Sequence, residues 1–125
     1  MQEKFIRPIL YISGIVTLLA GAQFLAPSFV LRTTGVPVGD VGGVFYAQHW
    51  GLMVLVVGAL LVYAARHSEV RRPIMLAAGL EKLGFVGMLL TQWSEPALQG
   101  LHGAVAFDSA CVVLYLIYLF RRSPA

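Results

Sequence analysis

Apolar residues along this chain form long, nearly unbroken stretches that short polar segments separate. Four stretches reach or approach the roughly 20 residues that a helix needs to cross a bilayer, and they cover residues 9–25, 44–65, 74–93 and 98–120. The second and third connections are short, so neighbouring helices must pack against each other. The pattern predicts an all-α integral membrane protein, in which residues 1–125 form a single domain, an antiparallel bundle of four transmembrane helices.

Prolines mark the predicted ends of these helices. Pro8 and Pro73 precede the first and third stretches, where a helix tolerates proline because its first amide groups are unpaired. Residues 94–96 form a tight break between the third and fourth stretches. The first stretch is the shortest, and the basic residues before it also fit a cleavable signal peptide. We expect an uncleaved span.

The first connection, residues 26–43, is the longest. Ser28 and Gly35 are typical of the start and end of a short helix. The apolar residues between them would let this helix lie on the outer membrane surface as a lid. An unstructured tether is the alternative interpretation.

Composition supports the membrane assignment. Apolar residues make up 58% of the chain and charged residues 12%, whereas soluble domains carry about 25% charged residues. The net charge of +3 does not indicate a nucleic-acid partner, because the basic residues lie in short clusters beside the apolar stretches and not along one face. The single cysteine, Cys111, is expected to be a small buried hydrophobe.

Lysine and arginine predict the orientation of the helices. Seven of them flank the N-terminus, the second connection and the C-terminus: Lys4, Arg7, Arg66, Arg71, Arg72, Arg121 and Arg122. The first and third connections together contain only Arg32. Because basic residues favour the cytoplasmic side, we expect a multi-pass protein of the cytoplasmic (inner) membrane with both termini in the cytoplasm.

Three charged residues lie inside the apolar stretches: Glu81, Lys82 and Asp108. One such residue at the centre of a membrane helix costs roughly 2.5–3.5 kcal/mol, so each needs a partner, water or a task. At about 1.5 Å per residue, Glu81 and Asp108 lie roughly 18 and 15 Å below the same side of the membrane. We expect the two carboxylates to lie at one level on adjacent helices.

The same three residues leave several interpretations open. A buried ion pair between Lys82 and Asp108 would fix the register of two helices. Glu81 and Asp108 could alternatively work as a pair of acid and base, or remain protonated because they are desolvated. A further possibility for Lys82 is that its long stem reaches the cytoplasmic headgroups.

Two histidines form a second group of candidate residues. His49 and His102 lie a turn or two inside the second and fourth stretches, at matching depth, in the segments Gln48-His49-Trp50-Gly51 and Gln99-Gly100-Leu101-His102-Gly103. Bonds to neighbouring glutamines are the common outcome for such residues, and titration near neutral pH above the carboxylates is the functional alternative. Haem ligation would need both rings at the bundle centre. The pattern predicts no metal site and names no cofactor.

These residues together predict a polar pocket that opens outward within the bundle. Candidates for catalysis are Glu81, Asp108, His49 and His102, and candidates for ligand binding are Gln48, Trp50, Gln92, Lys82 and Tyr46. Gln92 follows Glu81 on the same helix face through Gly84 and Met88. Gly84 either lets two helices approach closely or leaves space for a ligand.

The order of features resembles the DoxX-like superfamily of small four-helix bacterial membrane proteins. The resemblance covers most of the chain, through Gly14, Gly21 and Pro27, then Gly51 and Gly58 followed by Arg66, and then Arg71-Arg72-Pro73. It implies a four-helix membrane fold and, for some members, association with quinone-linked redox enzymes. The elements Gln48-His49-Trp50-Gly51 and Glu81-Lys82 lie outside this likeness.

The sequence therefore supports three functional hypotheses. The first is a membrane protein that binds a lipid-soluble small molecule, such as a quinone, a sterol-like compound or an isoprenoid, as an accessory subunit or alone. The second is a membrane-embedded isomerase or hydrolase that uses Glu81 and Asp108 as acid and base on an apolar substrate. The third is a structural or proton-conducting subunit of a homo-oligomer or of a complex with a partner subunit. Membrane lipid is an expected partner in all three.

Overall fold

The computed structural model describes residues 2–121, without the side chains of residues 27 and 29–31; Arg122 lies outside the described residues. This part of the chain is helical and contains no strand. Its α-helices are α1 (Glu3–Ala20), α2 (Pro27–Thr34), α3 (Val41–Arg66), α4 (Arg71–Leu90) and α5 (His102–Phe120), with short 3-10 turns η1 (Gly21–Phe24), η2 (Ser68–Val70) and η3 (Pro96–Leu101).

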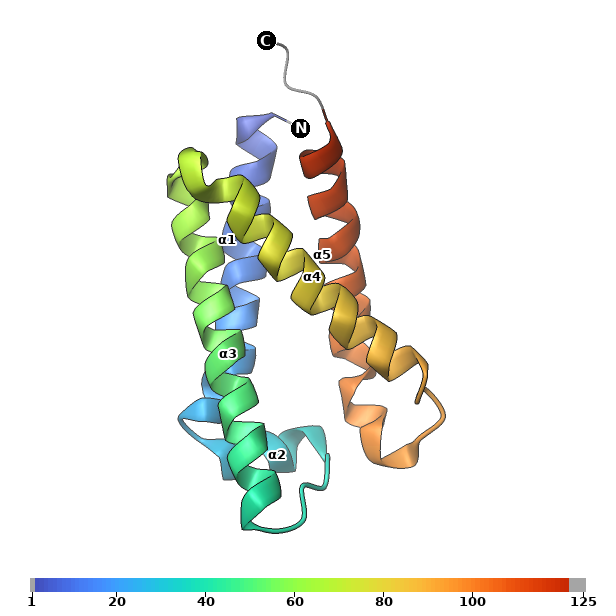
Figure 1. Cartoon of the computed structure of the whole chain (residues 1–125). Helices are drawn as coiled ribbons and strands as arrows, with labels where there is room; N and C mark the ends of the chain where they lie inside the picture. The colour runs from blue at the N-terminus through green and yellow to red at the C-terminus, as the bar shows by residue number, and fades with distance from the viewer. Residues whose placement is uncertain (1, 122–125) are drawn as a thin grey trace.

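Four of the helical segments are long and apolar enough to cross a membrane. They are α1 with η1, α3, η2 with α4, and η3 with α5. The prediction of four such helices is confirmed. Figure 1 shows α1 and α3 side by side, while α4 crosses at an angle and lies beside α5.

Helix α1 starts at Glu3, several residues before its predicted beginning, so Pro8 lies inside the helix. Two ion pairs explain the longer helix: the Glu3 carboxylate contacts Arg7 at 3.2 Å, one turn along, and Arg71 at 2.7 Å. A carboxylate in the first turn also interacts favourably with the helix dipole. Pro73 is the third residue of α4, in the first turn, where the pattern places it.

The predicted short helix in the first connection is present as α2. It begins at Pro27, one residue before Ser28, and it ends at Thr34, directly before Gly35. Gly35 has φ +72°, a left-handed conformation that glycine adopts without strain and that commonly ends helices. Asp40 then caps α3, since its Oδ1 accepts a hydrogen bond from the Gly43 amide at 3.0 Å.

Helices α1 and α3 pack backbone against backbone through glycines. A methyl group at Gly58 would lie 2.6 Å from the Leu18 nitrogen, and one at Gly21 would lie 2.6 Å from the Leu55 Cα. A methyl at Gly51 would be equally close to Phe24. Because only glycine fits these positions, they fix the distance between the two helices. We call this contact the α1–α3 interface.

Arg71 joins three helices at one end of the molecule, which we call the Arg71 end. Its side chain is 1% exposed. It donates hydrogen bonds to both carboxylate oxygens of Glu3, at 2.7 and 3.0 Å, and to the carbonyl oxygens of Ala64 and Ala65, each at 3.0 Å. A cation thus satisfies the last carbonyls of α3. The start of α1, the end of α3, the start of α4 and the end of α5 all lie at this end (Figure 1).

The apolar core lies between the Arg71 end and the middle of the helices. It contains Ile6, Leu10, Leu61, Met75 and Tyr115 among its fully buried side chains. Cys111 also belongs to this core and is buried, as expected. The sequence position of Tyr115 near a helix end is typical of an interface anchor, but the structure buries the ring because its hydroxyl has a partner on α1.

Candidate functional site

Two of the three charged residues inside the predicted membrane helices form an ion pair. Lys82 Nζ on α4 lies 2.8 Å from Asp108 Oδ1 on α5. Both side chains are largely enclosed, with exposed fractions of 2% and 14%. Of the alternatives left open for Lys82, the pair with Asp108 is the one observed. A charge pair in apolar surroundings persists only when further hydrogen bonds satisfy its remaining atoms.

Helix α1 supplies those hydrogen bonds. Lys82 Nζ also donates to Thr17 Oγ1 at 3.1 Å, and the Thr17 hydroxyl donates to the Ser13 carbonyl oxygen at 2.6 Å. The Ser13 hydroxyl lies 2.6 Å from the Tyr115 hydroxyl. The Phe107 ring also lies near the ammonium group, with its centroid 5.2 Å from Lys82 Nζ. The network thus connects α1, α4 and α5.

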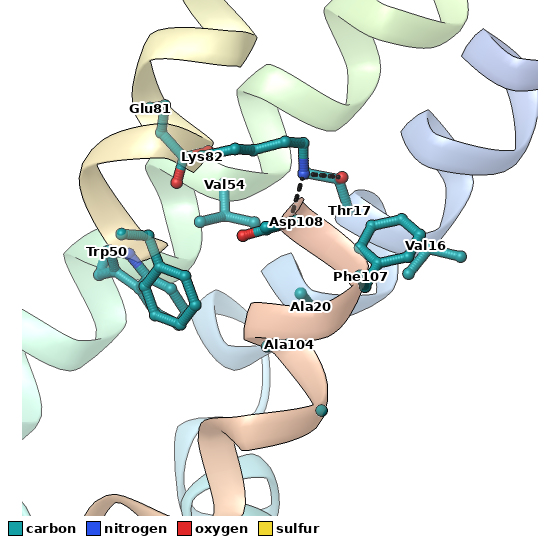
Figure 2. Close-up of a pocket in the computed structure, with 12 residues that line it drawn as sticks. Val16, Thr17, Ala20, Trp50, Val54, Glu81, Lys82, Ala104, Phe107 and Asp108 are labelled. Carbon is teal, nitrogen blue, oxygen red and sulfur yellow. Dashed lines mark hydrogen bonds and ion pairs between the residues drawn. The ribbon is translucent and has the colours of Figure 1, made fainter. Parts of the chain in front are cut away.

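A cavity of about 320 Å³ lies beside the ion pair, and we call it the ion-pair pocket. Helices α1, α3, α4 and α5 all contribute to it: Val16, Thr17, Ala20, Trp50, Val54, Glu81, Lys82, Phe85, Gly103, Ala104, Phe107 and Asp108 line it. Figure 2 shows the Lys82 side chain extending across this space, so that its ammonium group lies between Thr17 and Asp108. Apart from Thr17 and the three charged residues, the lining is apolar.

A second cavity, of about 620 Å³, adjoins the first, and we call it the loop pocket. The segment after α2 and the start of α3 form one side of it, and α4 forms the other. Its lining is Gln23, Thr34, Val36, Val38, Gly43, Tyr46, Ala47, Trp50, Met53, Val54, Leu80, Glu81, Gly84, Phe85, Met88 and Leu101. The first connection therefore forms part of the wall of this cavity, and its role as a lid on the outer membrane surface stays a prediction.

Glu81 belongs to the lining of both pockets. The other shared residues are Trp50, Val54 and Phe85, and the Trp50 and Phe85 rings stack with centroids 6.2 Å apart. Within residues 2–121, Glu81 makes no hydrogen bond and no ion pair, because the neighbouring ammonium of Lys82 is directed to Asp108. Glu81 is thus a half-buried carboxylate at the boundary of two largely apolar cavities.

Glycines on α4 and α5 leave this space open. A methyl group at Gly84, which lines the loop pocket, or at Gly103, which lines the ion-pair pocket, would meet nothing within 4 Å beyond its own helix backbone. Of the two interpretations of Gly84, the structure therefore supports space over close helix contact. Gly87 is equally free of neighbours but lines neither pocket.

The structure brings together five of the predicted site residues and separates the others. Glu81, Asp108, Lys82 and Trp50 line the ion-pair pocket, and Tyr46 lines the loop pocket with Glu81 and Trp50. The remaining four line neither pocket: His49, His102, Gln48 and Gln92.

Two of these four residues are exposed, and the other two make contacts outside the pockets. His49 and Gln92 are exposed. The His102 ring stacks on Trp93 with centroids 3.7 Å apart, and its Nε2 lies 3.2 Å from the Trp93 carbonyl oxygen. Gln48 donates a hydrogen bond to the Phe24 carbonyl oxygen at 3.0 Å and so helps to hold η1 on α3. A catalytic role of the histidines stays a prediction, and the two rings do not meet at the bundle centre that haem would need.

Sequence reasoning missed Thr17, Phe85 and Phe107 as parts of the site. Depth was the signal that would have found Thr17. Thr17 comes eight residues after Ile9, and Lys82 comes eight residues after Ile74, so both lie roughly 12 Å from the same side of the predicted spans. The two phenylalanines carried no such signal, because apolar residues surround them in sequence.

The chemistry that this arrangement offers is recognition and proton transfer. Within residues 2–121 no three side chains of His, Cys, Asp or Glu gather in a way that could hold a metal ion. Two carboxylates and one ammonium line an otherwise apolar space, and they can hydrogen-bond to a polar group on a ligand or exchange a proton with it.

Comparisons with known proteins do not narrow these possibilities. No family model, no curated protein and no solved structure matches this chain. The DoxX-like resemblance therefore stays a prediction, and the functional argument rests on the pockets themselves.

Proposed function

We propose that this protein is an antiparallel four-helix bundle in the cytoplasmic membrane that binds a lipid-soluble small molecule in the ion-pair and loop pockets. Segregation of basic residues supports the orientation. Lys4, Arg7, Arg66, Arg71 and Arg72 belong to the helix ends and the connection at the Arg71 end (Figure 1). By the positive-inside rule, the Arg71 end faces the cytoplasm, and the opposite end, which carries the first and third connections, faces outward.

The observation that carries the proposal is Glu81 on the common wall of two largely apolar cavities. An ionised carboxylate without an ion-pair partner is unfavourable in such a place, and a ligand or water that contacts it offsets this cost. The two cavities measure about 320 and 620 Å³, within the range of about 300–1,000 Å³ that ligand pockets occupy. A quinone, a sterol-like compound or an isoprenoid has a large apolar part that suits such a lining and a polar group that could contact Glu81.

Native mass spectrometry of protein released from lipid nanodiscs tests this proposal. We expect the wild-type protein to retain a small molecule other than bulk phospholipid. The Gly84→Leu variant should lose it, since a leucine side chain at this position projects into the loop pocket. Gly87→Leu is the matched control, because it places the same side chain on the same helix outside both pockets. Equal retention by both variants, or a wild-type protein without a bound molecule, would contradict the proposal.

A second candidate function is acid–base catalysis, favoured by the presence of Glu81 and Asp108 in one pocket. The experiment that separates it from binding compares the molecules recovered from the wild-type and Glu81→Gln proteins after incubation with the same ligand. A binding protein returns the ligand unchanged in both cases. An isomerase or hydrolase returns a chemically altered molecule from the wild type alone.

A further inference from the structure

The charges that line the two pockets do not balance. Glu81 and Asp108 supply two carboxylates, and Lys82 supplies one ammonium group. Arginine, histidine and further lysines are missing from the described lining of both pockets. With all three groups ionised, the site carries one negative charge in excess, in apolar surroundings where such a charge is costly.

Lys82 cannot serve both carboxylates equally. Its ammonium group has three N–H donors; one is directed to Asp108 Oδ1 at 2.8 Å and one to Thr17 Oγ1 at 3.1 Å. The Phe107 ring lies on a further side, 5.2 Å from Nζ. Lys82 is also 2% exposed, so its ammonium group is enclosed at Asp108, and within residues 2–121 Glu81 lacks a cation that contacts it.

The wall next to Glu81 is aromatic. Trp50 and Phe85 line both pockets together with Glu81, and their rings stack at 6.2 Å. The faces of aromatic rings attract cations, most strongly when water is excluded, and tryptophan is the best of them. A carboxylate beside aromatic rings, on the wall of an apolar cavity, is a combination that suits an organic ammonium group.

We propose that the ligand is a lipophilic cation, whose ammonium group pairs with Glu81 against Trp50 and Phe85 and whose apolar part fills the loop pocket. This inference rests on the proposed function and specifies its ligand class. A bound cation would complete the charge balance of the site, since it makes two positive charges face two negative ones.

Two probes with the same apolar chain test the inference: farnesylamine, which is cationic at neutral pH, and farnesol, which is neutral. Binding is followed by the fluorescence of Trp50 in a Trp93→Phe background, where it is the only tryptophan. The protein is placed in phosphatidylcholine nanodiscs, and empty nanodiscs give the partitioning of each probe. We expect farnesylamine to bind about tenfold more tightly than farnesol after this correction, a difference of about 1.4 kcal/mol.

Variants of Glu81 then assign the preference to one carboxylate. Glu81→Gln should remove the tenfold preference, and Glu81→Asp, which keeps the charge, should retain most of it. Glu95→Gln is the control for net charge, because it removes one carboxylate from the exposed connection between α4 and η3. It should leave the preference unchanged.

The possible results separate the inference from the proposed function. Equal binding of both probes to the wild type would overturn the cation inference and leave the binding function intact; it is the result that a protonated Glu81 gives. Failure of both probes to bind would overturn the inference and count against the binding function too. A preference that survives Glu81→Gln would show that another group recognises the charge.

Discussion

Glycines have opposite surroundings in the two halves of this molecule. Between α1 and α3, a methyl group at Gly58 or Gly21 would come within 2.6 Å of the facing backbone. On α4 and α5, a methyl at Gly84 or Gly103 would meet nothing within 4 Å beyond its own helix. The first set brings two helices into close contact, whereas the second leaves room beside a group of charged residues.

The difference shows that small residues in membrane helices have two separable uses. Close helix approach is favourable in lipid because van der Waals packing replaces the hydrophobic driving force. A glycine on a pocket wall makes no such helix contact. Its missing side chain instead leaves space for the pocket. The α1–α3 interface is therefore closely packed, whereas glycines on α4 and α5 leave space in the pockets that the helices line together.

The ion pair joins α4 to α5, and its Lys82 also donates a hydrogen bond to Thr17 on α1, which connects the two halves. Its disruption should have the largest effect. Asp108→Asn leaves the buried Lys82 ammonium without its counter-charge, which costs about 3–5 kcal/mol in buried pairs. Chemical denaturation in detergent micelles measures the loss. The double variant Lys82→Met with Asp108→Asn should recover most of the stability, since neither position then carries a charge that has lost its partner. An Asp108→Asn protein as stable as the wild type would contradict the structural importance of the pair.

Substitution at the α1–α3 interface should rank next. Gly58→Leu forces α1 away from α3, because the new side chain collides with backbone atoms of Leu18 and Gly14; overpacking of this kind costs about 1–3 kcal/mol or more. Gly84→Leu introduces the same side chain into open space and should change stability by less than about 0.5 kcal/mol. Thermal unfolding of both variants in the same detergent measures the difference. Equal destabilisation would erase the distinction between the two halves.

The hydroxyl contact between α1 and α5 should have a smaller effect. Tyr115→Phe and Ser13→Ala each remove one side of the 2.6 Å contact. Hydrogen bonds between membrane helices contribute about 0.6 kcal/mol on average. A double-mutant cycle of the two substitutions should give a coupling energy near this value. Strictly additive effects would mean that the two hydroxyl groups do not interact.

Neutralisation of Glu81 should have the smallest effect on stability. Glu81→Gln preserves the shape of the side chain, and no ion pair or hydrogen bond of Glu81 within residues 2–121 is lost. We expect a change of less than about 0.5 kcal/mol. The same denaturation experiment measures it beside Asp108→Asn. A loss as large as that of Asp108→Asn would mean that Glu81 stabilises the fold and does not serve a binding site.

Length and hydropathy were sufficient to predict the four long helices, because a helix that crosses a bilayer needs a long apolar stretch whatever its partners are. Depth along the helices was also sufficient to place Glu81 near Asp108, and both line the ion-pair pocket. These properties depend on one helix at a time, and the sequence states them directly.

The direction of each side chain around its helix was harder to predict, since it depends on how the helices are rotated against each other. His102 was chosen for its depth and Gln92 for the helix face that it shares with Glu81, yet His102 stacks on Trp93 and Gln92 is exposed. Tyr115 is buried because Ser13 faces it across the bundle. Whether a glycine faces a neighbouring helix or a pocket also depends on this rotation, so the sequence did not distinguish the two cases.

An experimental density map of the protein in lipid nanodiscs, purified without added ligand, tests most directly whether Glu81 serves a ligand pocket. The account predicts continuous density beside Glu81 and Trp50 that belongs to no residue of the chain, together with Lys82 bonded to Asp108. A map in which side chains fill both cavities and the Glu81 carboxylate points outward to lipid would contradict it.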